Sequence, residues 1–158
     1  MNILFFLTPK EAVAYVYDDY PLGQVMQRME QLRYAAIPVL RRSGEYFGTL
    51  TEGDVLWAIK NKYCPDIDKA SNLPISDIPR RSDNKAVTVS TNIDDLISMA
   101  LDQNFVPVED DRGMFIGIVT RRHVIQYYKD KLESMQKEYQ AQREMPLNKD
   151  NSEQKGNH

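Results

Sequence analysis

The chain contains one internal repeat, and this repeat constrains its fold more than any other feature of the 158 residues. Pro38 and Pro107 are 69 residues apart, and later glycines and threonines keep the same offset. The segments AIPVLRRSGEYFGTLTEGDVLWAI (36–59) and FVPVEDDRGMFIGIVTRRHVIQYY (105–128) therefore align without a gap. Such self-similarity indicates two copies of one supersecondary unit that bury a surface against each other.

Apolar residues at helical spacing precede each copy. They are Val25, Met26, Met29 and Leu32 before the first copy, and Ile93, Leu96, Ile97, Ala100 and Leu101 before the second. The other expected elements are strands around the two prolines, second strands at 46–50 and 115–119, and closing helices at about 52–61 and 121–139. Because proline cannot donate to a sheet ladder, we expect Pro38 and Pro107 on an edge strand or at a strand end.

The expected fold class is α+β, with two β-α-β-β-α repeats related by a pseudo-two-fold axis. One hairpin with two helices buries too little surface alone, so two copies would bury their sheets jointly. We place the first repeat at 1–63, a linker rich in Pro, Ser, Asn and Asp at 64–73, and the second repeat at 74–128. A C-terminal helix at 129–145 precedes a tail at 146–158, which we expect to be disordered because it has almost nothing to bury.

The C-terminal helix carries an apolar stripe whose partner the sequence leaves open. Its residues alternate at spacings of three and four: Ile125, Tyr128, Leu132, Met135 and Tyr139. Such a stripe fits a helix docked on its own domain and fits equally a seam between two chains.

Composition limits the function classes. The formal net charge is −3, with 42% hydrophobic and 27% charged residues, the balance of a soluble globular protein. This charge argues against a general binder of nucleic acid or anionic membranes, since both require a basic surface. The apolar start MNILFFLT is too short for a signal peptide or a membrane span, so we expect a cytoplasmic protein.

Enzyme and metal motifs are missing from the sequence. The single cysteine, Cys64, permits no intrachain disulfide, and His123 has no second ligand spaced with it, so we expect no metal site. Neither a glycine-rich phosphate loop, nor His-Glu-x-x-His, nor Gly-x-Ser-x-Gly occurs, so we expect no catalysis and no resident cofactor.

The doubled order of helix, x-Pro-Val strand, glycine turn and Gly-h-h-Thr-x-x-Asp (h, hydrophobic) resembles the tandem CBS-domain module, named for cystathionine β-synthase. The segments FLTPKEAVAYV (6–16) and PISDIPRRSDNKAVTV (74–89) are similar to those that lead into each CBS repeat. The resemblance covers about residues 1–128. It implies a regulatory module that binds adenine nucleotides in clefts between its repeats and pairs into homodimers.

In that family, one cleft combines the lead-in strand and x-Pro-Val segment of one repeat with the Thr-x-x-Asp of the other. The resemblance therefore implies a first site made of Ala14, Tyr34, Ala35, Ala36, Thr120, Arg121, Arg122 and His123. It implies a second nucleotide cleft made of Val87, Asn104 and Phe105 with Thr51 and Asp54.

A narrower likeness is to the small stand-alone two-CBS proteins of Gram-positive bacteria that bind cyclic di-AMP. The segments that carry it are RYAAIPVL (33–40) and NFVPVEDDRGMFIGIVTRRHVI (104–125). In that group a tyrosine-small-small run and twin arginines belong to the ligand site, and here these are Tyr34-Ala35-Ala36 and Arg121-Arg122. Ala35 stands where a hydroxyl residue is usual, which removes one expected hydrogen bond to the ligand.

The Thr-x-x-Asp motif has two readings. Thr51 and Asp54 have the spacing of a capping box at the start of a helix. As ligand chemistry, the carboxylate would accept hydrogen bonds from both hydroxyls of a ribose, and the two roles are compatible.

The second copy differs, because His123 replaces the aspartate and Arg121 and Arg122 enter the first turn of the helix. Cations there oppose the helix dipole, whereas they would suit a bound phosphate. The alternative is that both arginines form surface ion pairs with acidic residues at 109–111. We therefore predict a cyclic di-AMP sensor that signals to a protein partner. An AMP or ATP sensor, or a ligand-free dimerisation module, remains the alternative.

Overall fold

The computed structural model describes residues 2–63, 66–81 and 83–145 of the chain. They divide into two compact units, Met1–Val124 and Ile125–His158. The helix α5 (Arg121–Glu144) runs from the end of the first unit into the second. The tail expected to be disordered, 146–158, and the single cysteine, Cys64, lie outside the described residues.

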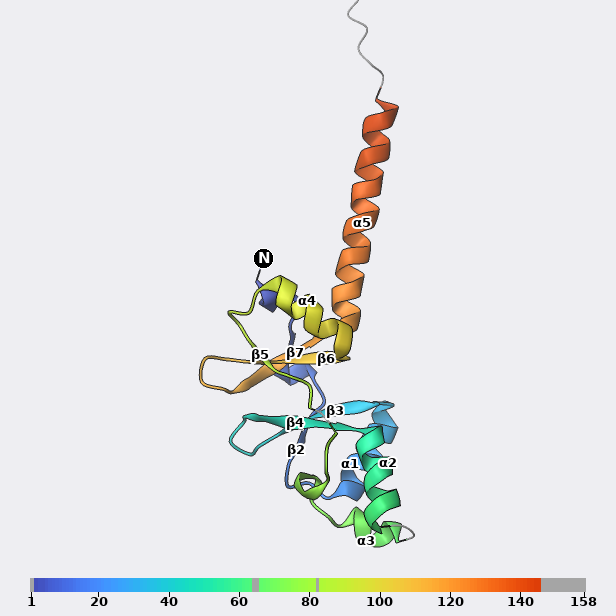
Figure 1. Cartoon of the computed structure of the whole chain (residues 1–158). Helices are drawn as coiled ribbons and strands as arrows, with labels where there is room; N and C mark the ends of the chain where they lie inside the picture. Colours follow the sequence, from blue (N-terminus) through green and yellow to red (C-terminus); the bar gives the residue numbers. More distant parts are fainter. Residues whose placement is uncertain (1, 64–65, 82, 146–158) are drawn as a thin grey trace, which may run out of the picture. The chain divides into compact units, whose positions relative to one another are not determined.

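Both repeats have the expected order of strands and helices, which confirms the α+β class. The first repeat consists of β2 (Val16–Tyr17), α1 (Leu22–Leu32), β3 (Ala36–Leu40), β4 (Tyr46–Thr51) and α2 (Glu52–Ala58). The second consists of β5 (Val87–Thr88), α4 (Ile93–Asp102), β6 (Phe105–Glu109), β7 (Phe115–Thr120) and the start of α5. Figure 1 shows the two sheets in the middle of the first unit, with α1 and α2 outside one sheet and α4 outside the other.

Shorter elements fill the connections. They are the 3₁₀ turns η1 (Ile3–Phe6), η2 (Lys10–Ala12) and η4 (Ile75–Asp77), strand β1 (Thr8–Pro9), the π-helical turn η3 (Ile59–Tyr63) and helix α3 (Ile67–Ser71). Helix α3 lies inside the segment expected to be a linker, 64–73.

The sequence repeat is reproduced in the hydrogen-bond register of the two hairpins. Ala36 pairs with Thr51 in the first repeat, and Phe105 pairs with Thr120 in the second. Each hairpin also shifts its register one residue before the end of its first strand. The hairpin turns carry Gly44 and Gly113 with φ of 99° and 80°, a backbone conformation that glycine adopts without steric cost.

Helical periodicity predicted the buried faces of α1 and α4 correctly. It also included one residue at the end of each helix that is in fact exposed. Val25 and Met29 in α1 and Leu96 in α4 are buried. In contrast, Leu32 is 40% and Leu101 76% exposed, because both occupy the last turn of their helices.

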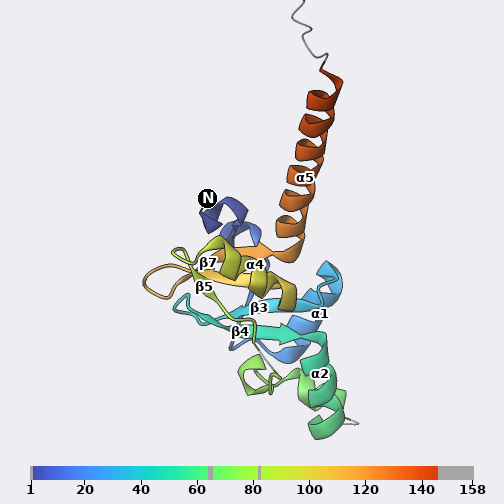
Figure 2. The same cartoon turned by 45° about the horizontal axis from the view of Figure 1, so that its top comes forward.

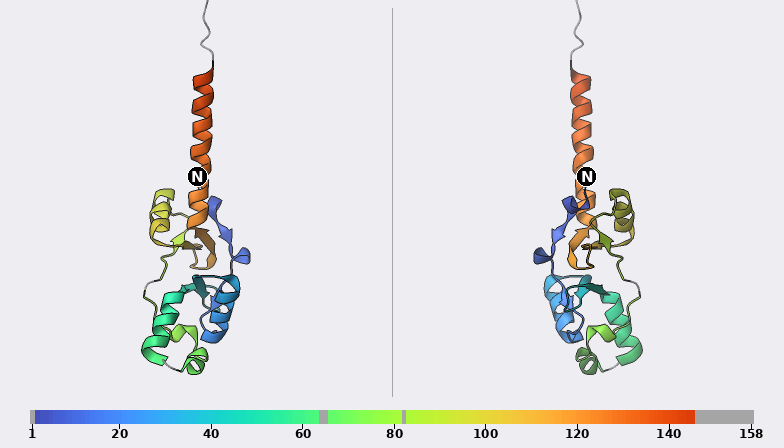
Figure 3. Two further views of the ribbon diagram at one scale, coloured as in Figure 1. Left: turned by 90° about the vertical axis from the view of Figure 1, so that its right-hand side faces the viewer. Right: turned by 90° about the vertical axis from the view of Figure 1, so that its left-hand side faces the viewer.

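The two repeats exchange their lead-in segments. Strand β1 pairs with β7 of the second repeat, with Thr8 opposite Ile118. Reciprocally, Ile75 and Ile78 lie in the hydrophobic core of the first repeat. Figure 3 shows the N-terminal segment (blue) and the connector (yellow-green) on opposite sides of this unit. The repeat boundaries expected from the sequence, 1–63 and 74–128, stay a prediction.

The exchange explains the paired glycines of the repeat. A Cβ on Gly117 would collide with the backbone oxygen of Thr8, where β1 crosses β7. A Cβ on Gly48 would stand 2.5 Å from Oδ1 of Asp83 and 2.8 Å from Nε of Arg80. Glycine at both positions therefore lets a lead-in segment lie directly on the sheet.

The expectation of edge strands for Pro38 and Pro107 is wrong. Strand β3 is central in the order β2-β3-β4, and β6 is central in β1-β7-β6-β5. The prolines are tolerated because the flanking parallel strands are only two residues long. Strand β2 pairs with β3 from Val39 onward, and β5 pairs with β6 from Val108 onward. On that side, neither proline has a neighbour that requires its missing N–H.

The two repeats meet through their hairpins. The backbone N–H of Phe115 donates to the carbonyl of Gly44 at 3.0 Å, and Glu45 and Met114 form an antiparallel bridge. The ring of Tyr46 stacks on that of Phe115 with centroids 6.4 Å apart. Figure 2 shows the two hairpin ends on the same side of the unit.

A polar network crosses the same junction. The Tyr46 hydroxyl donates to the carbonyl of Asn84 at 2.9 Å and lies 2.6 Å from Oγ1 of Thr49. The side-chain amide of Asn84 donates in turn to the carbonyl of Phe105 at 3.1 Å. Burial raises the pKa of Tyr46 well above the usual value near 10, so its hydroxyl keeps its proton.

Candidate functional site between the repeats

A cavity of about 340 Å³ lies between the two repeats. The first repeat and its lead-in segment contribute Thr8, Ala12, Val13, Ala14, Arg33, Tyr34, Ala35, Ala36 and Pro38, and the second contributes Asn104, Phe105, Ile118 and Thr120. Its volume is in the range of small-ligand pockets, and its walls are mostly small or apolar. Five residues of the implied first site are therefore neighbours: Ala14, Tyr34, Ala35, Ala36 and Thr120.

The chain direction at Tyr34–Ala36 is set by the end of α1. The helix stops at Arg33, which is left-handed with φ 55° and ψ 41°. The N–H of Arg33 donates to the carbonyl of Glu30, and that of Tyr34 to the carbonyl of Met29. This is the Schellman pattern, and it turns the chain out of the helix into β3. Tyr34 remains 39% exposed, so its ring is available to a ligand.

Thr51 and Thr120 play the same local role in the two repeats. Oγ1 of Thr51 accepts from the N–H of Asp54 at 3.1 Å, and Oγ1 of Thr120 accepts from the N–H of His123 at 3.1 Å. Each threonine is thus the N-cap of the helix that follows its strand. The side-chain cap holds the threonine hydroxyl at the helix entrance, and Thr120 there faces the cavity.

Arg121 is not among the residues that line the cavity. Its Nε donates to the carbonyl of Ala100 at 2.7 Å, and a terminal nitrogen donates to the carbonyl of Leu101 at 3.3 Å. These carbonyls belong to the last turn of α4, where helix C=O groups lack intrahelical partners. A cation also interacts favourably with that end of the dipole. Arg121 therefore caps α4.

Arg122 and His123 are not among the residues that line the cavity. Both are exposed in the first turn of α5. Nδ1 of His123 is 3.5 Å from Oγ1 of Thr8, which does line the cavity. Arg122 makes no hydrogen bond or ion pair within the described residues. The ion pairs with the acidic residues at 109–111, the alternative to a phosphate site, are likewise missing among the described residues.

Asp54 is buried, 4% exposed, and belongs to a different cavity of about 570 Å³. The residues that line it are Asp54, Trp57, Ala58, Asn61, Pro79, Arg80 and Arg81. Oδ2 of Asp54 accepts from the N–H of Thr51 at 3.0 Å, which completes the capping box. Oδ1 accepts from the N–H of Arg81 at 3.1 Å. Both carboxylate oxygens therefore already hold a backbone donor.

Among the described residues, members of the implied second cleft line two different cavities, Asp54 the larger one and Asn104 and Phe105 the one between the repeats. Asn104 and Phe105 line the first cavity, and Val87 is buried. At the positions that correspond to Ala14 and Tyr34, the N–H of Lys85 donates to Oε1 of Gln103 at 2.8 Å. The amide of Gln103 returns a hydrogen bond to the carbonyl of Lys85 at 3.1 Å. The two sides of the module are therefore not equivalent.

Sequence reasoning missed several residues near the two cavities. Thr8, Ala12 and Val13 reach the first cavity only because the lead-in segments are exchanged, which no local pattern reveals. Trp57 and Arg81 lie near Asp54, with the guanidinium carbon 5.6 Å from the indole centroid. Arg33 was missed although it directly precedes the Tyr34–Ala36 run.

The described residues contain no group of three or more His, Cys, Asp or Glu placed to hold a metal ion. Within the same part of the chain, no helix has both the length and the apolar character that a membrane crossing needs.

A family model described as the CBS domain matches residues 7–61 and 75–130, which is more than half of the chain. No curated protein shows significant sequence similarity to it.

Solved structures share the fold at low identity. The chain is 21% identical to CbpB in complex with c-di-AMP, with a TM-score of 0.78 over 88% of this chain and 91% of that one. It is 23% identical to the CbpB protein of Listeria monocytogenes in complex with c-di-AMP (TM-score 0.73; 83% and 97% covered). It is also 23% identical to CBSX2 in complex with AMP (TM-score 0.67; 82% and 96% covered).

Proposed function

The chain belongs to the CBS-domain family and carries the paired repeats of a regulatory module; from this premise we propose that it is a cyclic di-AMP sensor. The ligand binds in the 340 Å³ cavity between the repeats and acts as a regulatory ligand rather than a resident cofactor. The observation that carries the proposal is the meeting of Tyr34–Ala36 from one repeat with Thr120 from the other in a single cavity.

The walls suit a flat base. Ala35 and Ala36 leave room where larger side chains would fill the cavity, and the half-exposed ring of Tyr34 offers a stacking face. Asn104 and the hydroxyl of Thr120 supply polar groups that orient a ligand. Two structural neighbours, both named CbpB, hold c-di-AMP in this fold, which supports the same ligand class here.

A ligand in this cavity would touch both repeats at once. It would favour the packing of the repeats that gives it the most contacts, and the shift cannot exceed its differential affinity for the two packings. We propose that a protein partner binds one packing of the repeats in preference to the other. We also propose that the module is a homodimer.

Calorimetric titration of the purified full chain with cyclic di-AMP, with AMP and ATP as parallel titrants, tests the proposal. We expect tight dinucleotide binding that is weakened at least about fivefold by Tyr34→Ala, because a base–aromatic stack contributes about 1–3 kcal/mol. The matched control is Tyr139→Ala, an exposed tyrosine of α5. Dinucleotide affinity equal in Tyr34→Ala and wild type would exclude this site.

A second candidate is AMP or ATP in the 570 Å³ cavity beside Asp54. One observation favours it: a carboxylate, an indole ring and two arginines line the same cavity. Asp54 would accept from a ribose through its remaining lone pairs, Trp57 would stack on the base, and Arg81 would meet a phosphate. The neighbour CBSX2 in complex with AMP supports this ligand class.

Asp54→Asn separates the two candidates, because it should weaken AMP binding strongly and dinucleotide binding hardly at all. If no adenine nucleotide binds or raises the melting temperature, a ligand-free dimerisation module is favoured instead. Its marker would be a dimer that dissociates when residues 129–158 are removed, since Leu132, Met135 and Tyr139 are all more than half exposed on α5.

A further inference from the structure

Arg33 occupies an unusual backbone position. Among the described residues it is the one non-glycine residue with positive φ, at 55°. The left-handed conformation at a helix end is disfavoured for residues with a Cβ, and glycine is the common solution there. An arginine in this place therefore suggests that its side chain has a role beyond ending α1.

Arg33 also contributes the charge of the ligand cavity. It is the one charged residue among the described residues that line the 340 Å³ cavity. Arg121, the alternative cation, is held by the carbonyls of Ala100 and Leu101. The guanidinium of Arg33 makes no hydrogen bond or ion pair within the described part of the chain. Arg33 therefore adds an unpaired cation to the lining of an otherwise neutral cavity.

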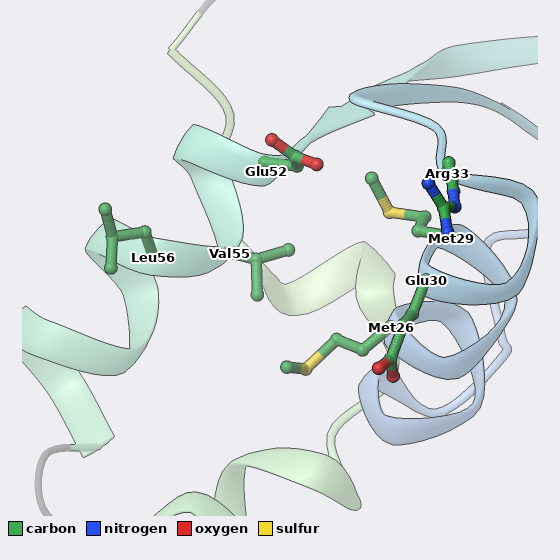
Figure 4. Close-up of a pocket in the computed structure, with 7 residues that line it drawn as sticks. All are labelled: Met26, Met29, Glu30, Arg33, Glu52, Val55 and Leu56. Atoms are coloured by element: carbon green, nitrogen blue, oxygen red, sulfur yellow. The ribbon is translucent and has the colours of Figure 1, made fainter.

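The same residue lines a second space, a groove of about 530 Å³ between α1 and α2. The groove has apolar walls of Met26, Met29, Val55 and Leu56, and its other charged residues are Glu30 and Glu52. Figure 4 shows Arg33 and Glu52 at the same end of this groove. Within the described residues no ion pair joins Arg33 to either glutamate, so no partner fixes its guanidinium in the groove.

We propose that Arg33 is the phosphate-binding and specificity-determining residue of the cavity. Its guanidinium leaves the groove and makes a charge-assisted, bidentate contact with a phosphate of the ligand whose base lies against Tyr34–Ala36. This inference rests on the proposed nucleotide-binding function. It assigns the phosphate contact within the cavity wall to Arg33, in place of Arg121.

Arg33→Gly gives a test in which stability and affinity move in opposite directions. Glycine relieves the left-handed conformation, so the ligand-free variant should melt about 3 °C higher than wild type. Its affinity for cyclic di-AMP in calorimetry should fall at least about tenfold. Affinity for adenosine, which has no phosphate, should not change. A loss of affinity in a more stable protein cannot be ascribed to misfolding.

Two further variants sharpen the result. Arg28→Ala removes an exposed arginine from the same helix, outside the cavity, and should leave affinity within twofold of wild type. Glu52→Gln should strengthen dinucleotide binding about twofold, because it removes a carboxylate that competes for the guanidinium. In the Arg33→Gly background the same substitution should have no effect.

The outcomes are distinguishable. If the wild-type chain binds cyclic di-AMP and Arg33→Gly binds it within twofold, the assignment of Arg33 is wrong while the proposed function stands. Equal losses of affinity in Arg33→Gly and Arg28→Ala would show that the effect arises from net charge alone. This result would also overturn the assignment of Arg33. If the wild-type chain binds neither cyclic di-AMP nor AMP, the proposed function fails, and the role of Arg33 with it.

Discussion

The carboxylate of Asp54 accepts a hydrogen bond from the backbone N–H of Arg81, with 3.1 Å between Oδ1 and the nitrogen. Asp54 lies at the start of α2 in the first repeat, and Arg81 belongs to the connector that enters the second. The residue that completes a local helix cap therefore also fixes a segment 27 residues further along the chain.

Asp54→Ala should destabilise the protein by about 3 kcal/mol, because two backbone N–H groups lose a charged, buried acceptor. Urea unfolding of the ligand-free chain measures this. The matched control is Asp95→Ala, which removes the carboxylate from the third position of α4, where it is exposed. The control should cost less than about 1 kcal/mol. Equal losses of unfolding free energy in the two variants would mean that the contact between Asp54 and Arg81 adds nothing to stability.

Gly117→Ala should cost about 3 kcal/mol and loosen the N-terminal segment, since the new Cβ meets the backbone of Thr8 in β1. Gly48→Ala should cost less, about 2 kcal/mol, because the side chains of Arg80 and Asp83 can swing aside at the loss of their ion pair and of the hydrogen bond from the Thr49 N–H to Asp83. Thermal unfolding ranks the two variants. Hydrogen exchange of residues 3–9 should accelerate in Gly117→Ala alone, and the reverse ranking would contradict the exchanged lead-in segments.

Tyr46→Phe should cost about 1–2 kcal/mol at pH 7, because the carbonyl of Asn84 and the hydroxyl of Thr49 lose their shared partner. The exposed Tyr139→Phe is the control and should be neutral.

Tyr46 should also make the stability of the protein depend on pH. Burial raises its pKa above the unfolded value near 10, so the neutral form is favoured in the folded state. Its contribution to stability is complete below pH 10 and is lost as the pH rises further towards the folded-state pKa. The free energy of unfolding between pH 9 and 11.5 should therefore fall less steeply in Tyr46→Phe than in Tyr139→Phe. Parallel curves would show that Tyr46 is not protected from titration.

Arg121→Ala should cost about 1–2 kcal/mol, because the carbonyls of Ala100 and Leu101 lose their donor. Arg122→Ala should stay within about 0.5 kcal/mol of wild type, as expected for an exposed side chain without a partner in the described residues. Differential scanning calorimetry of the ligand-free proteins separates the variants. If Arg121→Ala is as stable as Arg122→Ala, the contact of Arg121 with the end of α4 contributes nothing to stability. Arg121 would then be available to bind a ligand.

The sequence by itself determined the elements and their order. A 69-residue repeat placed two hairpins and their flanking helices within a few residues of where they lie, and Thr51 and Thr120 at the starts of helices. These features follow from local periodicity and local hydrogen bonds, which the order of residues encodes directly. The resemblance to the CBS module implied that Tyr34–Ala36 and Thr120 belong to one site, and these residues line one cavity.

Only the tertiary structure decided which distant segments meet. It placed Pro38 in a central strand beside a neighbour too short to need its N–H, and it placed Thr8 on Gly117 by exchanging the lead-in segments. It brought the side chain of Arg121 to the carbonyls at the end of α4, so that Arg33 is the cation that lines the cavity. An arginine has the same identity in every context. Its partner is decided by which carbonyl or cavity the folded chain brings within reach, and no spacing along the sequence carries that information.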